Sequence, residues 1–280
     1  MTQEDQKAMK TVGCITNLAA AVAHIMGIAP PLQAQEPLTA LEEAAPFGGH
    51  CAQRVLLYHP DAVALWLYQR YPQMLSAVSD RAKFFAPLRS VLPPVTPVCF
   101  SSMYTGAAPQ VHGVTTYTKP VVQTDTLFDV LLRAGKKPAI VSTQNDSMSL
   151  LFLQRDMDYI ICPTVEECNE KAQDLIRRDE HDFIAVYNGD YDAAMHRYSP
   201  EGAEALQALA ANARAFAALW DTAVQVWRGR RAMVGFCTDH GCHEIDGGLG
   251  SHGLDMPQDM EIAHFYGFLP ENGNSCSDTW

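Results

Sequence analysis

An acidic and an imidazole side chain are neighbours in the segment 236–241, which reads Phe-Cys-Thr-Asp-His-Gly, and another imidazole, His252, lies twelve residues after His240. Carboxylate and imidazole groups in this pattern can bind a divalent metal ion. A buried Asp239–His240 hydrogen bond or a plain turn at Gly241 would explain the pair about as often. The segment therefore becomes informative only together with residues elsewhere in the chain.

Further residues of the same kinds follow other apolar runs of the sequence. Asp61 follows the run 54–58, and Asp192 and His196 follow the run 182–188. The last two are four residues apart, so one helical turn places both on one side. Thr96 directly precedes Pro97, which suits the first turn of a helix. With Asp239, His240 and His252 these residues form a set of seven candidate ligands, enough for two metal ions.

The elements that must position these residues alternate along the chain. Runs that indicate strands cover 54–58, 137–142, 159–162, 182–188 and 232–236, and helical patterns cover 97–104, 163–178 and 200–230. This alternation predicts an α/β fold with a mainly parallel central sheet and helices on both faces. Ligands bind beyond the carboxyl ends of the strands in such folds, and the candidate residues lie at those ends.

Length and charge limit the domain organisation and the partners. The chain has 280 residues, 48% of them hydrophobic, so it can bury a sizeable core. We expect a single catalytic domain, in which residues 1–32 contribute a packed helix, 33–52 a connector, 53–268 the metal-site core and 269–280 a tail. The net charge of -12 argues against binding of a nucleic-acid polymer, which requires Lys and Arg to neutralise phosphates. The sequence indicates no oligomeric state.

Cysteine spacing and the N-terminal segment indicate the cellular compartment in which we expect the protein. The eight cysteines have neither zinc-knuckle nor redox spacing, which favours a reducing, cytoplasmic setting. Read from Met9, the chain could alternatively begin with a secretory signal. Polar Asn17 and His24 interrupt its apolar part, and the spacing of the apolar residues is that of one helix face. A packed helix ending at Gly27 is therefore the favoured interpretation, and the run is too short and polar to span a membrane.

Two motifs around Thr96 carry a family resemblance. Residues 95–106 read Val-Thr-Pro-Val-Cys-Phe-Ser-Ser-Met-Tyr-Thr-Gly, and residues 109–114 read Pro-Gln-Val-His-Gly-Val. Their spacing resembles the nucleophile region of the nucleotide pyrophosphatase/phosphodiesterase branch of the alkaline phosphatase superfamily. The segments 192–200, 238–241 and 251–253 are similar to the later motifs of that family, in the same order.

The resemblance implies a fold, a site and an activity. It implies an alkaline-phosphatase-like core in which Asp192, His196 and His252 bind one metal ion, Asp61, Asp239 and His240 bind the other, and Thr96 is the nucleophile facing both. The mixed His/Asp set favours zinc, although manganese or iron would tolerate it. The expected activity is metal-dependent hydrolysis of a small phosphorylated substrate, with a phosphodiester or nucleotide pyrophosphate bond foremost. Phosphomonoester or phosphonate hydrolysis, a phosphomutase reaction, and a non-catalytic phosphate-binding relative remain alternatives.

Three departures from the family pattern need a structural explanation. Ala62 stands where the family has Gly, which matters if the backbone there has a positive φ. Cys99 stands where the diesterases have an Asn that binds the substrate, so the resemblance makes Cys99 the candidate substrate-binding residue, although a thiol is a weak donor. The helical text 15–30 precedes the motifs, whereas the family has similar text after the last one. We hypothesise a circular permutation, in which this helix packs where the C-terminal one would.

Overall fold

The computed structural model describes residues 11–271, and its centre is an eight-stranded sheet. The residues before 11, including the signal-like start at Met9, and the predicted tail from position 272 onward lie outside the described residues. The strand order is β1 (Gly13–Cys14), β3 (Phe84–Arg89), β10 (Glu261–Leu269), β7 (Ala232–Cys237), β2 (Arg54–Pro60), β6 (Phe183–Asn188), β4 (Pro138–Thr143) and β5 (Asp158–Cys162). Only β10 runs antiparallel to its neighbours. The predicted α/β fold with a mainly parallel sheet is confirmed.

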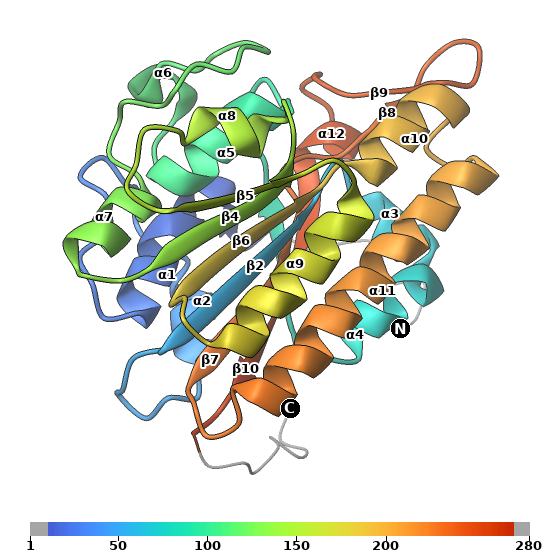
Figure 1. Cartoon of the computed structure of the whole chain (residues 1–280). Helices are drawn as coiled ribbons and strands as arrows, with labels where there is room; N and C mark the ends of the chain where they lie inside the picture. Colours follow the sequence, from blue (N-terminus) through green and yellow to red (C-terminus); the bar gives the residue numbers. More distant parts are fainter. Residues whose placement is uncertain (1–10, 272–280) are drawn as a thin grey trace.

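Helices cover both faces of the sheet (Figure 1). One face carries α3 (Leu65–Arg70), α4 (Ser76–Ser79), α9 (Val165–Arg178) and α11 (Ala203–Val226). The other carries α1 (Leu18–Ile25), α2 (Thr39–Ala44), α5 (Thr96–Thr105), α7 (Leu127–Arg133) and α8 (Ser147–Leu151). Short 3₁₀ turns precede α1 and α4, at Ile15–Asn17 and Pro72–Leu75.

Strand β2 shows why the sheet strands read as continuous apolar runs. Val55 and Leu57 belong to the core cluster under α1 and α5, whereas Leu56 and Tyr58 belong to the cluster under α9 and α11. Side chains alternate between the faces of a strand, and both faces of this strand are covered. All four side chains are therefore fully buried.

Strands β3 and β10, which lie between β1 and β7 in the sheet, did not stand out in the sequence. Strand β3 contains Pro87, and β10 begins with Glu261 and contains His264. Both patterns are atypical of a central strand. The two strands pair with each other and extend the sheet beyond β7.

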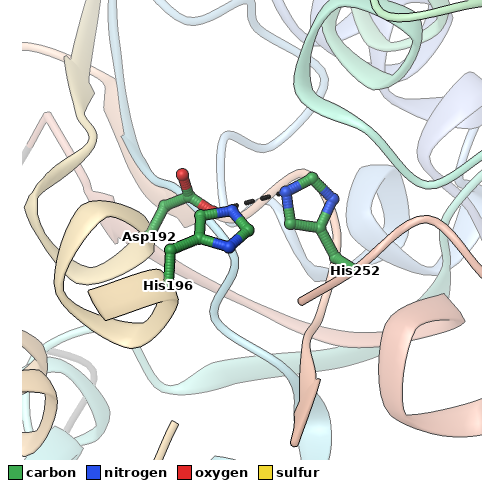
Figure 2. A group of neighbouring side chains, drawn as sticks. All are labelled: Asp192, His196 and His252. Atoms are coloured by element: carbon green, nitrogen blue, oxygen red, sulfur yellow. Dashed lines mark ion pairs between the residues drawn. The ribbon is translucent and has the colours of Figure 1, made fainter. Parts of the chain in front are cut away.

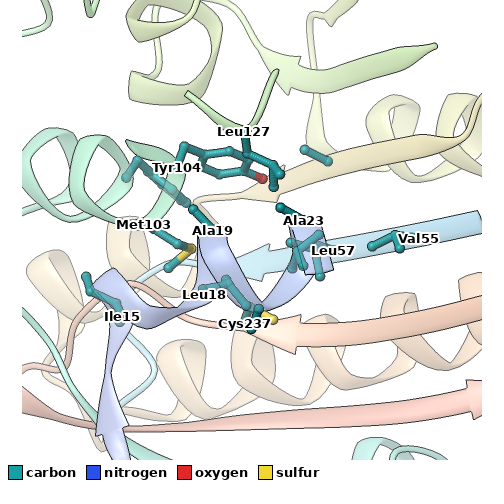
Figure 3. Close-up of a cluster of buried hydrophobic side chains, with 14 of the residues drawn as sticks. Ile15, Leu18, Ala19, Ala23, Val55, Leu57, Met103, Tyr104, Leu127 and Cys237 are labelled. Atoms are coloured by element: carbon teal, nitrogen blue, oxygen red, sulfur yellow. The ribbon is translucent and has the colours of Figure 1, made fainter. Parts of the chain in front are cut away.

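Helix α1 packs directly on the sheet (Figure 3). Leu18, Ala19 and Ala23 are buried against a cluster that includes Leu57 of β2 and Cys237 of β7. The preceding strand β1 pairs with β3 in parallel. The predicted packed helix is thus part of the core, as the circular-permutation hypothesis requires; the permutation itself stays a hypothesis. Within residues 11–271, none of the helices has the length and apolar character needed to cross a bilayer.

Candidate metal centre and nucleophile

The candidate residues meet beyond the carboxyl ends of three neighbouring strands, β7, β2 and β6. Asp61 follows β2, and Asp239 and His240 follow β7. After β6 the chain enters α10 (Asp190–Tyr198), which carries Asp192 and His196. His252 follows β9 (Gly250–Ser251), which pairs with β8 (His243–Glu244) to form a hairpin beside α10 (Figure 1). Parallel strands place all of these residues at one edge of the sheet.

Asp61, Asp239 and His240 form a fully buried group. Nε2 of His240 lies 3.3 Å from Oδ1 of Asp61 and 3.4 Å from Oδ2 of Asp239. Nδ1 of the same ring is 2.9 Å from the carbonyl oxygen of Gly241. When Nδ1 carries the proton and donates it to that carbonyl, Nε2 presents its lone pair to the two carboxylates.

Asp192, His196 and His252 form the second, more open group (Figure 2). Oδ1 of Asp192 lies 3.3 Å from Nε2 of His196 and 3.5 Å from Nε2 of His252. Both rings again have Nδ1 at a backbone carbonyl, that of Gly250 for His196 and that of Pro94 for His252, at 3.0 Å in each case. The two groups adjoin, because the rings of His240 and His252 stack with centroids 4.1 Å apart.

Both groups fit a divalent metal ion. Each contains buried carboxylate oxygens without a hydrogen-bond partner among the described residues, namely Oδ1 of Asp61, Oδ1 of Asp192 and Oδ2 of Asp239. These are the same oxygens that face the imidazole nitrogens. Zinc ligands at about 2.0–2.1 Å in tetrahedral geometry lie about 3.3–3.4 Å from one another. The spacings of 3.3 to 3.5 Å match this value, and a cation would satisfy the unpaired oxygens.

The three carboxylates of the two groups have pKa values shifted by burial and by neighbouring charges. Burial, followed by the charges of Asp239 and Asp192, raises the pKa of Asp61 well above its usual range. Burial also raises the pKa of Asp239. Burial alone would raise the pKa of Asp192, but the adjacent His196 side chain and the charges of His240 and His252 bring it below its usual value. Bound cations would favour the ionised form of all three.

Thr96 is the first residue of α5 and lies beside the buried group. Its Oγ1 donates to Oδ2 of Asp61 at 3.2 Å and lies 3.3 Å from Nε2 of His240. The residue is 4% exposed, so its hydroxyl is held in the site rather than in solvent. It also lies at a helix N-terminus, where the backbone favours anions.

Tyr187, in β6, belongs to the site although the sequence did not single it out. Its hydroxyl donates to Oδ2 of Asp61 at 2.5 Å. Oδ2 therefore accepts from two hydroxyl groups, those of Tyr187 and Thr96, and Oδ1 is left free. The only signal in the sequence was the position of Tyr187 next to the end of a predicted strand.

Solved structures with this architecture were found at low sequence identity. An inactive threonine-to-alanine variant of murine ectonucleotide pyrophosphatase/phosphodiesterase 5, in complex with AMP, matches with a TM-score of 0.60 and 11% identity over 79% of this chain and 90% of the other. Phosphonoacetate hydrolase from Sinorhizobium meliloti 1021, in complex with phosphonoformate, matches with a TM-score of 0.53 and 19% identity over 73% of this chain and 62% of the other. Both belong to the alkaline phosphatase superfamily.

The chain has the fold of the alkaline phosphatase superfamily. The resemblance inferred from the motifs is confirmed at the level of the fold. No family model matches the chain, and neither does any curated protein. The human ectonucleotide pyrophosphatase/phosphodiesterase 5 matches with a TM-score of 0.53 and 13% identity over 69% of this chain, but the match spans only 58% of the human chain. The phosphonoacetate hydrolase is likewise covered to less than two thirds.

Cys99 and Ala62 depart from the superfamily motifs, and the structure shows what surrounds each of them. Cys99 is completely buried, and its Sγ lies 3.2 Å from Oγ of Ser90, which donates to the carbonyl oxygen of Asp239 at 2.7 Å. Burial, together with the charge of Asp239, raises the pKa of the Cys99 thiol well above its usual range. Cys99 therefore packs against Ser90, which holds the backbone of Asp239, and its side chain has no surface open to a substrate. Its predicted role in substrate binding stays a prediction without support from this geometry.

Ala62 has the backbone conformation that favours Gly, with φ at +63°. A non-glycine residue there costs roughly 1–2 kcal/mol. Two hydrogen bonds hold the strained turn, from Ala62 N–H to Oδ1 of Asp239 at 3.3 Å and from Val63 N–H to Oγ1 of Thr238 at 3.0 Å. The turn thus connects the Asp61 and Asp239 segments.

Proposed function

We propose that this chain is a metal-dependent phosphoester hydrolase whose nucleophile is the hydroxyl of Thr96. The observation that carries the proposal is the position of Oγ1 of Thr96, at 3.2 Å from Asp61 and 3.3 Å from His240, beside two groups that could each hold a metal ion. A hydroxyl at a helix N-terminus among unpaired carboxylate oxygens suits attack on an anionic phosphorus centre.

Asp61, Asp239 and His240 would hold one divalent ion, and Asp192, His196 and His252 the other, with zinc favoured by the mixed ligand set and manganese or iron as alternatives. Two such ions would lower the pKa of the Thr96 hydroxyl and neutralise charge on the phosphate oxygens. Two dications and three carboxylates leave a local charge of about +1, which favours an anionic substrate in an acidic protein.

The chain's own residues orient the nucleophile and receive its proton. Asp61 uses Oδ2 to accept from the Thr96 hydroxyl, so the same oxygen is placed to take the proton as Oγ1 attacks phosphorus. Tyr187 keeps that carboxylate in one orientation through its own hydrogen bond to Oδ2. The carbonyls of Gly241, Gly250 and Pro94 fix the three imidazole rings. The attack forms the bond between Oγ1 and phosphorus, breaks the bond to the leaving alcohol or phosphate, and leaves the rest of the substrate as a phosphate ester of Thr96, which water then hydrolyses.

A phosphodiester or nucleotide pyrophosphate is the proposed substrate class. Support comes from the murine neighbour in the alkaline phosphatase superfamily, which is an inactive threonine-to-alanine variant bound to AMP. From the motif resemblance, Thr96 would correspond to the threonine that is replaced in that variant. A second candidate is a phosphonate, because the bacterial neighbour is a phosphonoacetate hydrolase bound to phosphonoformate.

The test combines metal analysis with activity of matched variants. Purified protein is analysed for bound metals and assayed on aryl phosphate diesters, aryl phosphate monoesters and phosphonoacetate, beside Thr96→Ala and Thr96→Ser. We expect Thr96→Ala to lose about 10³-fold or more in kcat, because the covalent step is removed, and Thr96→Ser to keep measurable activity. Equal activity of wild type and Thr96→Ala would disprove the nucleophile assignment. Bound metals without turnover of any substrate would favour the non-catalytic relative.

A further inference from the structure

A large cavity lies at the edge of the sheet opposite the metal centre. It has a volume of about 1140 Å³ and is bounded by α2, the residues leading into β3, the C-terminal end of α11 and the end of β10. Phe268 and Leu269 of β10 pair with Met233 and Ala232, at the start of β7, whereas the metal ligands follow the other end of that strand. The proposed phosphoester chemistry uses no residue of this cavity.

The walls of the cavity are predominantly apolar. They include the side chains of Phe84, Phe85, Trp220, Val224, Phe268 and Leu269. The ring of Trp220 lies directly on the backbone of Gly267, where a Cβ atom would come within 2.2 Å of the ring. The volume is slightly above the roughly 300–1,000 Å³ typical of small-molecule sites. A flexible hydrocarbon chain would fit such walls.

The charged residues of the cavity indicate which polar group a ligand with a hydrocarbon chain would carry. Arg81, Lys83 and Arg228 contribute to the lining, against one carboxylate, Glu43. Arg81 is bound to Asp221, but Lys83 and Arg228 form neither a hydrogen bond nor an ion pair with residues 11–271. Both side chains are exposed to solvent beside the cavity, so both are open to a ligand in a chain of net charge -12. Their positive charges are complementary to an anionic group on a ligand.

We propose that this cavity binds a long-chain fatty carboxylate, with the hydrocarbon chain between Phe84, Trp220 and Phe268 and the carboxylate at Lys83 and Arg228. An uncharged hydrocarbon would leave both cations unpaired, and a cationic amphiphile would be repelled by them. A narrow hydrocarbon chain can enter a concave cavity, whereas the flat surface of a second protein copy cannot fill it.

The test measures binding of dodecanoate, below its micelle concentration, to the full chain by isothermal titration calorimetry. We expect saturable binding that strengthens from octanoate to dodecanoate, because each added methylene is buried, and much weaker binding of dodecanol and dodecyltrimethylammonium. Lys83→Ala/Arg228→Ala should weaken dodecanoate binding about tenfold or more. The matched control, Lys171→Ala on the exposed side of α9, should bind as wild type does.

A fluorescence experiment localises the ligand. The terminal bromine of 12-bromododecanoate quenches nearby tryptophans, and Trp220→Phe should remove most of the quenching while binding persists. Equal affinity for dodecanoate and dodecanol, or unchanged affinity in the Lys83/Arg228 variant, would overturn the proposal. It would also be overturned if sedimentation showed a dimer that uses this face and excludes dodecanoate.

Discussion

The hydroxyl of Tyr187 donates to Oδ2 of Asp61 at 2.5 Å, from the strand that lies next to the strand leading to Asp61. Thr96 donates to the same oxygen. Because both hydrogen bonds use Oδ2, Oδ1 remains free and directed to His240 at 3.3 Å. One tyrosine therefore determines which oxygen of Asp61 is available as a ligand.

Replacing Tyr187 with Phe should weaken metal binding more than folding. Without the hydroxyl, the Asp61 carboxylate can rotate, and loss of such an outer hydrogen bond typically costs 10- to 100-fold in metal affinity. Zinc titration of the metal-free protein by calorimetry measures this loss. The control is Tyr159→Phe, whose hydroxyl contacts the carbonyl of Phe152 away from the site. Equal affinity of Tyr187→Phe and Tyr159→Phe would show that Tyr187 does not position Asp61.

Cys99→Ala tests whether the buried thiol contributes to substrate binding. Since Cys99 is completely buried behind Asp239, we expect a loss of about 1 kcal/mol in unfolding free energy and less than about a threefold change in kcat/KM. A residue that donates to a phosphate oxygen would instead lower the rate about 10²- to 10³-fold when removed. Urea unfolding and the diester assay, on the same preparation, separate the two outcomes.

Helix α1 should contribute to global stability as an integral part of the core. Leu18 is 2% exposed on the sheet side of α1, whereas Leu32, just beyond this helix, is 81% exposed. Leu18→Ala should cost about 3 kcal/mol in unfolding free energy through lost burial and a residual cavity. Leu32→Ala should change it by less than about 0.5 kcal/mol. Similar small effects of both changes would indicate that residues 15–28 are not part of the cooperative core.

Acid should destabilise the protein through buried neutral histidines, of which His264 is a clear case. Burial lowers the pKa of His264 from 6.5 to about 4, although its hydrogen bond to the Thr238 carbonyl opposes this shift. The unfolded chain binds the proton first, so the stability from His264 is complete above pH 6.5 and falls as the pH drops toward 4. The expected loss is roughly 3 kcal/mol.

The measurement compares unfolding free energies at pH 7 and pH 4.5 in wild type and His264→Gln. The variant should be less stable at pH 7 but should lose less on acidification, because Gln does not titrate. Leu32→Ala changes no titratable group at a side chain that is 81% exposed, and this variant should retain the wild-type pH dependence. An equal acid loss in wild type and His264→Gln would exclude His264 as the cause.

The sequence predicted the sheet and the convergence of the candidate ligands because both depend on local patterns. Strands buried on both faces appear as apolar runs, and a parallel sheet places the residues after those runs at one edge. Asp61, Asp192 and Asp239 could therefore be grouped without knowledge of the strand order. Their roles as metal ligands remain predictions that the metal analysis addresses.

The contacts that the sequence did not reveal depend on the register between strands and on the direction in which helix side chains point. Tyr187 reaches Asp61 because β6 pairs with β2 so that Tyr187 is opposite His59, and no local pattern specifies that register. Cys99 shares a helix with Thr96 but points into the core, which depends on how α5 packs. The positive φ of Ala62 is likewise invisible in the sequence, since Ala normally avoids it.

The two candidate metal groups differ in how firmly the fold encloses them. His240 is completely buried at the end of a central strand, whereas the His196 side chain is 42% exposed on a helix next to a short hairpin. Exchange of a bound ion requires solvent access, so an ion held by the Asp192 group would pass to a chelator faster than an ion held by the Asp61 group. The protein would then carry one permanent ion and one that follows the surrounding metal concentration, so that its activity would depend on the supply of metal as well as of substrate.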